Sequence, residues 1–325
     1  MARRATSLAG LPVARLFDGS GDGYPPLVID RYGGLLVAHY FPPNAEEERG
    51  GGALDAVRGA LLGLEGEIRS ALPEARSLLL KSHPHDAKEN RERKPETLWG
   101  EEPSPTSILE EDGLRFEIRP GGSLFCGLYP DTAFLRRRLR GTVAAKVMNT
   151  FAFTGSLGIA CARAELDQEI LQIDSSPAAL DWASANWALN QGAFPRARMR
   201  FLCDDCLNFM EREARRIERG AAKCGVVILD PPSFGRGRNK VFSLKNDART
   251  LLAAAIQCLE ADGTLVFTAN YRAWPPEKLR DLVATEAARA GREVLQAELL
   301  RPPAPLFPAR EPDSISVRGV LARLA

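Results

Sequence analysis

The 325-residue sequence lacks any apolar run long enough to cross a bilayer. The residues after Met1-Ala-Arg-Arg also lack the apolar core of a secretory signal peptide. Net charge is nearly absent, because 43 lysines and arginines are balanced by 42 aspartates and glutamates, for a formal charge of +1. We therefore expect a cytoplasmic protein with no membrane partner, in which any nucleic-acid surface is a local basic patch.

Signals for a metal site or a serine hydrolase are incomplete. The six cysteines are scattered, mostly in apolar runs, which is typical of reduced, buried thiols. Cys203-x-x-Cys206 has no second cysteine pair at zinc-finger spacing. The His83-Pro-His85-Asp86 cluster lies in a charged stretch without a further ligand nearby, and no Gly-x-Ser-x-Gly motif is present. We expect no bound metal.

One short stretch combines a buried strand with a stiff polar turn. Residues 226–229 are Val-Val-Ile-Leu, an apolar run typical of a buried strand, and Asp230 follows directly. Pro231 and Pro232 then prevent the strand from continuing, and Ser233 and Phe234 complete the turn. In an open α/β sheet, this places a carboxylate and an aromatic ring at the edge where ligands bind.

Strands and helices alternate from residue 145 onward. We expect strands over 146–150, 169–173, 198–202, 226–229, 263–268, 294–300 and 315–321, with helices between most of them. Repeated β-α units predict a mainly parallel sheet with helices on both faces. The predicted fold class is therefore α/β.

The first third of the chain shows a different pattern. Residues 27–40 read as a hairpin with Gly33-Gly34 at its tip, residues 53–72 are helical by period, and 83–102 read as a charged loop. We expect a small α+β domain over residues 1–124 and a catalytic domain over 125–325.

A glycine-bearing joint and an acid predict a site for an adenosine-containing cofactor. Gly155 and Gly158 follow the strand 146–150, and Asp174 ends the next strand, nineteen residues after Gly155. An acid at this spacing can bind both ribose hydroxyls, as in NAD-dependent enzymes. Only two of the three glycines of Gly-x-Gly-x-x-Gly are present, so a loop that binds pyrophosphate is poorly supported. S-adenosylmethionine (SAM) has no phosphate and does not need such a loop.

These motifs resemble those of known methyltransferases. Asp-Pro-Pro-Ser-Phe is similar to the Asp/Asn-Pro-Pro-Tyr/Phe motif of class I SAM-dependent enzymes that methylate nucleobases. Residues 149–156, Asn-Thr-Phe-Ala-Phe-Thr-Gly-Ser, resemble motif I of ribosomal-RNA methyltransferases that modify large-subunit RNA at cytosine C5 or guanine N7. Residues 27–33 resemble a segment of the small domain that precedes the catalytic domain in that family. The resemblance implies a Rossmann-like, seven-stranded methyltransferase sheet, SAM as cofactor and RNA as partner.

The same resemblance assigns roles to individual residues. It implies that the methionine end of the cofactor is held by Asn149, Phe151, Thr154 and Gly155. Asp174 and Ser175 would hold the ribose, and Asp205 and Cys206 the adenine. It implies a base site formed by Asp230, Pro231, Phe234 and Asn270. Stacking on the Phe234 ring is worth roughly 1–3 kcal/mol per base.

The end of the fifth strand bears on the atom that is methylated. Cytosine C5 needs a cysteine that first adds to the ring, whereas a nitrogen attacks through its own lone pair. The cytosine-C5 branch of the family has Ser/Thr-Cys-Ser at this point, but here the sequence is Thr268-Ala269-Asn270. We therefore expect methylation of guanine N7, with Asn270 matching that branch.

Four alternatives remain open, of which the last is a noncatalytic RNA-binding protein that keeps the fold. The first is cytosine C5 methylation with Cys126 or Cys206 as a displaced nucleophile. The second is a methyltransferase for a protein or a small molecule, which the low net charge allows. The third is a NAD-dependent oxidoreductase on the same fold.

Basic residues follow the Asp-Pro-Pro-Ser-Phe motif. Five of them stand against the single acid Asp247, which gives a local charge of +4. They are Arg236, Arg238, Lys240, Lys245 and Arg249. We expect Arg236, Arg238 and Lys240 to contact the RNA backbone, which supplies affinity without reading sequence.

Overall fold

The computed structural model describes residues 10–86, 94–121, 126–236, 241–271, 273–304, 307 and 316–325. The chain divides into two compact units, the first formed by residues 1–133 and 303–314, and the second by 134–302 and 315–325. The division therefore differs from a single boundary at 124–125. Hydrogen bonds explain the later boundary, since Tyr32 Oη donates to the Leu128 carbonyl at 3.0 Å and Arg119 N–H to the Cys126 carbonyl at 3.0 Å.

The second unit contains a seven-stranded sheet in the order β10-β9-β8-β11-β14-β16-β15. Its strands are β8 (Lys146–Thr150), β9 (Gln168–Asp174), β10 (Ala197–Cys203), β11 (Cys224–Leu229), β14 (Leu259–Ala269), β15 (Val294–Leu300) and β16 (Arg318–Leu324). The first five in spatial order run parallel, and β16 pairs antiparallel with both β14 and β15. The predicted fold class is confirmed.

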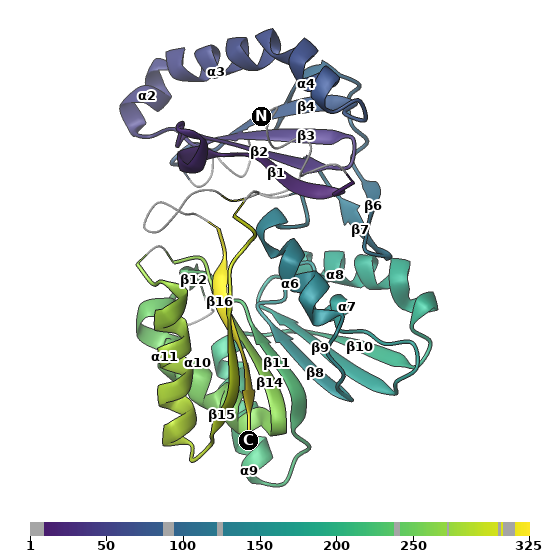
Figure 1. Ribbon diagram of the computed structural model, residues 1–325, viewed down its shortest axis with the longest axis vertical. Helices are drawn as coiled ribbons and strands as arrows, with labels where there is room; N and C mark the ends of the chain where they lie inside the picture. Colours follow the sequence, from purple (N-terminus) through teal and green to yellow (C-terminus); the bar gives the residue numbers. More distant parts are fainter. Residues whose placement is uncertain are drawn as a thin grey trace. The chain divides into compact units, whose positions relative to one another are not determined.

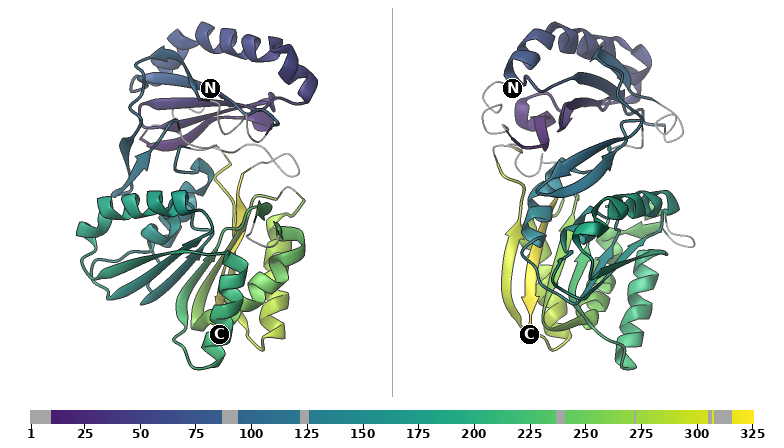
Figure 2. Two further views of the ribbon diagram at one scale, coloured as in Figure 1. Left: turned by 180° about the vertical axis from the view of Figure 1, so that it is seen from behind. Right: turned by 90° about the vertical axis from the view of Figure 1, so that its right-hand side faces the viewer.

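Helices cover both faces of this sheet, as Figures 1 and 2 show. The helices of the unit are α6 (Ala133–Leu139), α7 (Ser156–Ala160), α8 (Pro177–Asn190), α9 (Cys206–Glu218), α10 (Leu244–Cys258) and α11 (Pro276–Arg289). Met148, Val227, Leu229 and Phe267 form one core with α9, α10 and α11. Side chains alternate along a strand, so the intervening residues face α7 and α8 on the opposite side.

The first unit contains a five-stranded sheet in the order β1-β2-β3-β4-β5, with only β3 and β4 parallel. Its strands are β1 (Val13–Asp18), β2 (Leu27–Tyr32), β3 (Leu35–Tyr40), β4 (Ser77–Ser82) and β5 (Glu96–Gly100). Its helices are α2 (Ala45–Gly50), α3 (Gly52–Gly63) and α4 (Glu65–Ala71), and a separate hairpin joins β6 (Ser107–Glu111) to β7 (Leu114–Ile118).

For the first unit, the predicted hairpin is confirmed and the predicted loop is wrong in part. The predicted hairpin over 27–40 is β2 and β3, and Gly33 at its tip has φ 62°. The predicted loop over 83–102 is wrong for its last part, because β5 lies there. β5 pairs with β4 and buries Trp99, a pairing partner that local sequence does not reveal.

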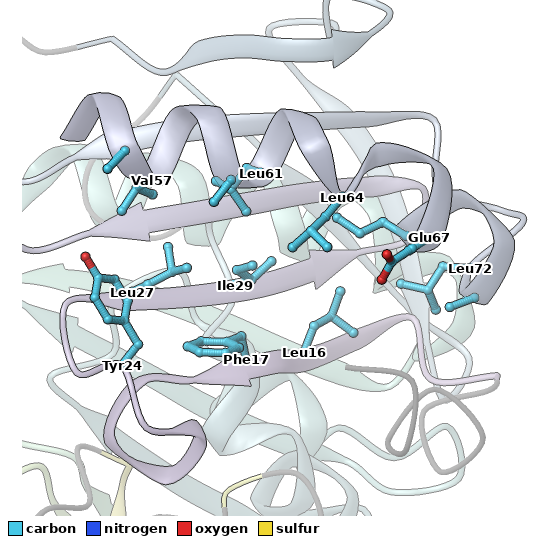
Figure 3. A pocket seen from close by; sticks show the side chains of 14 residues that line it. Leu16, Phe17, Tyr24, Leu27, Ile29, Val57, Leu61, Leu64, Glu67 and Leu72 are labelled. Carbon is cyan, nitrogen blue, oxygen red and sulfur yellow. The ribbon is translucent and has the colours of Figure 1, made fainter. Parts of the chain in front are cut away.

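A cavity of about 530 Å³ lies in the first unit between α3–α4 and the β1–β2 part of the sheet. Figure 3 shows side chains of the helices, such as Val57 and Leu61, facing side chains of the strands, such as Leu16 and Ile29. Glu67 is the one charged residue of its lining. This lining lacks the paired polar groups that a group-transfer reaction needs, whereas the edge of the sheet in the second unit carries polar side chains.

Among the described residues, no helix combines the length and the apolar character needed to span a membrane.

Candidate active site

The carboxyl ends of four parallel strands meet at one edge of the large sheet. Ladder pairing sets Thr150 opposite Ile173, and Leu229 opposite both Thr150 and Phe267. The next residue on each strand therefore lies at the same level, and these residues are Phe151, Asp174, Asp230 and Thr268. The strand order reverses between β8 and β11, where open α/β sheets bind their ligands.

Asp174 anchors the loop that follows β8. Its Oδ2 accepts the backbone N–H of Phe153 at 2.9 Å, and its Oδ1 accepts the backbone N–H of Ser176 at 2.9 Å. Ser175, predicted at the cofactor site, is the residue between Asp174 and Ser176. A carboxylate has about four lone-pair sites, so Asp174 retains acceptor capacity for the two hydroxyls of a ribose.

The loop after β8 is strained. Phe151 and Phe153 have φ values of 56° and 49°, in the left-handed region that non-glycine residues rarely adopt. Each such residue costs on the order of 1–3 kcal/mol and persists where its surroundings hold it. Here the Phe151 N–H donates to Cys206 Sγ at 3.3 Å and the Ala152 N–H to the Ile173 carbonyl at 3.0 Å. Strain held in this way is typical of a ligand-binding loop.

Gln172 of β9 holds the same loop in place, and the sequence pattern did not predict this role. Its Oε1 accepts Asn149 Nδ2 at 2.7 Å, and its Nε2 donates to the Gly155 carbonyl at 3.1 Å. A Cβ at Gly158 would lie 2.3 Å from Gln172 Nε2. The structure thus places Asn149, which is 1% exposed, beneath the loop as a partner of Gln172 rather than on its surface.

Thr154 and Gly155 complete the turn into α7. Gly155 has φ 78°, and a Cβ there would lie 2.9 Å from Cβ of Ala183, so both conformation and space require glycine. The Thr154 carbonyl accepts Asn186 Nδ2 of α8 at 2.9 Å. The turn is therefore fixed to both the sheet and α8.

Asp205 and Cys206 lie at the start of α9. Asp205 Oδ1 accepts the Asn208 N–H at 2.9 Å, which makes it the N-cap of the helix. Cys206 is 4% exposed, and its Sγ donates to the Ile173 carbonyl at 3.5 Å. Burial raises the pKa of the Cys206 thiol well above its ordinary value. This thiol is an inert part of the packing and not an activated nucleophile.

The turn after β11 is tied to the end of β14 twice. Thr268 Oγ1 donates to Asp230 Oδ1, and Ser233 Oγ donates to the Asn270 carbonyl at 2.6 Å. Pro231 is buried and the Asn270 side chain is exposed. Phe234 is 65% exposed, which leaves the face of its ring available for stacking.

A short hairpin follows the turn and was not predicted. It joins β12 (Phe234–Arg236) to β13 (Val241–Ser243), with Phe234 paired to Ser243. Arg236 belongs to β12, whereas Arg238 and Lys240 lie outside the described residues. Arg249 forms an ion pair with the buried Glu286 at 2.8 Å, so it cannot be counted among unpaired cations beside the base site. This reduces the predicted local charge of +4.

The remaining predictions concern metals and nucleophiles. Within the described part of the chain, no group of three histidine, cysteine or acidic residues is arranged to hold a metal ion. Cys203 is exposed, and burial raises the pKa of Cys126 to about 12. Cys126 and Cys206, the two candidate nucleophiles, are thus both buried, and burial raises the pKa of each thiol.

A sheet of this order, with Asp174 at the end of β9 and Asp230 directly after β11, is typical of α/β enzymes that bind a nucleoside-containing cofactor at this edge. Residues 14–323 match the family model described as S-adenosylmethionine-dependent methyltransferase. The chain belongs to this family, SAM is its cofactor, and the NAD-dependent alternative is set aside.

Individual relatives agree with this family. The chain is 28% identical over 318 residues to the ribosomal RNA large subunit methyltransferase I of Enterobacter sp. (strain 638), covering 97% of this chain and 75% of the relative. It resembles the structure of SMU.776, solved in complex with SAH (TM-score 0.77, 18% identity, 99% and 78% of the two chains). It also resembles a SAM-dependent methyltransferase from Agrobacterium tumefaciens (TM-score 0.64, 20% identity, 96% and 90%).

The residues present fit this cofactor. Asp174 offers acceptors for a ribose diol, and the loop of residues 151–155 beside it is held in place because Gly155, without a side chain, packs closely against Ala183 and Gln172.

Proposed function

We propose that this enzyme transfers a methyl group from SAM to a base of large-subunit ribosomal RNA. The observation that carries the proposal is the pairing of a fixed carboxylate, Asp230, with the exposed ring of Phe234 at the sheet edge that also presents Asp174. The name of the curated relative, which specifies large-subunit ribosomal RNA, supports this class of substrate. We also propose a cytoplasmic location, where that RNA is found.

We propose the following roles for the cofactor half of the site. Asp174 and the adjacent Ser175 accept the ribose hydroxyls, and Asp205 and Cys206 lie beside the adenine. The loop of Phe151, Thr154 and Gly155 shapes the methionine end, with Asn149 supporting it through Gln172. When bound, SAM supplies a methyl group activated by a positively charged sulfur.

The base half positions a flat heterocycle. The Asp230 carboxylate and the Pro231 carbonyl accept N–H groups of the base, Phe234 stacks on its face, and Asn270 contacts its edge. Methyl transfer is an in-line displacement that depends on distance and alignment more than on acid–base groups. Fixing the base in one orientation is therefore the main contribution of these residues.

Two observations bear on the target atom, and they point in different directions. Ala269 stands where the cytosine-C5 branch of the family that the sequence resembles has its cysteine, and Cys206 is buried with a raised pKa. Both features favour attack by a base nitrogen such as guanine N7. Overall similarity gives guanine no such support, because the relative is named large subunit methyltransferase I without reference to guanine. Cytosine C5 agrees better with the relatives and is the second candidate.

The experiment is to incubate the protein with ribosomal RNA and SAM that carries a deuterated methyl group, and to analyse the nucleosides by mass spectrometry. The proposal predicts a labelled base. Label on a guanine supports attack by nitrogen, and label on C5 of cytosine establishes the second candidate. Label on protein alone, or on no RNA base in either free RNA or ribosomal particles, would refute the proposal.

The first unit is proposed to select the RNA. The described residues up to 121 show no recognisable catalytic cluster, yet this part of the chain accompanies the catalytic part in the family match, which begins at residue 14. The RNA contacts of Arg236, Arg238 and Lys240 likewise remain predictions.

A further inference from the structure

Thr268 is a polar residue in a strand end that is otherwise apolar. It is 1% exposed and follows Leu265, Val266 and Phe267, each 0% exposed. Its Oγ1 contacts two acceptors on the neighbouring strand, Asp230 Oδ1 and, at 3.3 Å, the Leu229 carbonyl. A buried hydroxyl in such a place needs a partner, and here that partner is the carboxylate of the proposed base site.

Strand register makes this contact possible. Leu229 pairs with Phe267 in a parallel ladder, so Asp230 and Thr268 are the next residues on adjacent strands and lie on the same side of the sheet. Valine has almost the same shape as threonine and would fill the same space. The hydroxyl is therefore a feature that packing alone does not require.

A carboxylate rotates easily about its last side-chain bond, because that torsion has broad minima. A donor bound to one oxygen fixes the plane of the group and hence the directions in which both oxygens accept hydrogen bonds. The link from Ser233 Oγ to the Asn270 carbonyl joins the same two segments and limits movement of the turn itself.

We propose that Thr268 is a positioning residue that orients the Asp230 carboxylate toward the base that accepts the methyl group. This inference rests on the proposed function and deepens it. It predicts that removing the hydroxyl lowers the rate of methyl transfer at saturating SAM and RNA while leaving SAM affinity unchanged.

The test compares Thr268→Val, which removes the hydroxyl, with Thr268→Ser, which retains it. The single-turnover rate of Thr268→Val should fall about 10- to 100-fold, the loss typical of a small misplacement of reacting groups. Thr268→Ser should stay within about threefold of the wild type, and the dissociation constant for SAM should change less than about threefold in both. Thr268→Ala serves as a second variant without the hydroxyl should Thr268→Val not fold.

Thr150→Val is the matched control. Thr150 is also buried at a strand end and donates through Oγ1 to a backbone carbonyl, that of Ile228 at 3.1 Å, without touching Asp230. It should lose comparable stability but keep its single-turnover rate at saturating SAM within about threefold. In the background of Asp230→Ala, Thr268→Val should have no further effect on the rate, because the two residues act as one unit.

The inference is overturned if Thr268→Val methylates RNA at the wild-type rate, if Thr150→Val loses as much activity, or if the effects of Thr268→Val and Asp230→Ala multiply. A wild-type protein that methylates no RNA base would refute the proposed function as well, which is a separate and recognisable outcome.

Discussion

Asp174 Oδ2 accepts the backbone N–H of Phe153 across 2.9 Å, so the same carboxylate holds a strained loop and lies at the proposed ribose site. Replacing Asp174 with alanine removes acceptors of charge-assisted hydrogen bonds, each worth about 1.5–3 kcal/mol. Asp174→Ala should therefore weaken SAM binding about 10- to 100-fold in calorimetry. Asp181→Ala, an exposed acid on α8, is the control and should bind SAM normally. Equal affinity in both variants would contradict the assignment.

Gly158 is expected to tolerate no side chain. An alanine Cβ would lie 2.3 Å from Gln172 Nε2, and Gln172 is 0% exposed and bonded to Asn149 and Gly155. Gly158→Ala should lower the free energy of unfolding by about 1–3 kcal/mol, the usual cost of overpacking, and should also weaken SAM binding. Gly192→Ala has open space around its Cβ and should change stability by less than about 0.5 kcal/mol. Urea unfolding of both variants checks the difference.

Cys203 is expected to be the fast-reacting thiol of the native protein. It is exposed, whereas the other five cysteines are buried. Iodoacetamide should label Cys203 first, and Cys203→Ser should lose this fast phase. Cys203 pairs with Asp174 in the ladder, and its Sγ lies 3.8 Å from the Ser175 carbonyl, so bound SAH should slow the labelling. Labelling that SAH leaves unchanged would count against a nucleoside site at this edge.

The positions of Asp174 and Asp230 at strand ends were predictable because each follows a strand that is mostly apolar. β8 and β15 have the predicted bounds, and Asp174 and Asp230 lie at the predicted strand ends. The contacts of these acids were not predictable. Gln172 and Thr268 act through partners on other strands, and the pairing of strands is decided by tertiary packing rather than by local pattern.

Short strands were the main failure of sequence reasoning. β5 follows a charged stretch, and β12 and β13 are three residues each, so none of the three strands shows enough alternation to be recognised. The predicted helix over 53–72 is divided at Leu64 into α3 and α4. Propensity over a window does not detect such a one-residue interruption.

The free energy of unfolding of the first unit should fall in mild acid because of His39. It contacts His83, Nδ1 to Nε2 at 2.9 Å, and burial, followed by the charges of His83, Arg15 and Lys81, lowers the pKa of His39 well below its ordinary value. The unfolded chain binds a proton at His39 below about pH 6.5, and the folded chain does not. Stability is therefore present above that pH and declines as the pH falls below it.

His39→Asn tests this pH dependence, because it keeps a polar group near Nδ1 but does not titrate. Between pH 6.5 and 5.5 the wild type should lose about 1 kcal/mol more of its free energy of unfolding than the variant does. Urea unfolding at both pH values measures the difference. Parallel losses in the two proteins would show that His39 does not contribute.

The role of Asp230 is tested most directly by the single-turnover rate of methyl transfer to RNA, measured together with SAM affinity, in the wild type and in Asp230→Ala. Loss of the carboxylate removes the group that orients the base, so the rate should fall at least about 100-fold. The dissociation constant for SAM should stay within about threefold of the wild type. A variant that methylates RNA at the wild-type rate would contradict the account, as would one that loses SAM binding in step with activity.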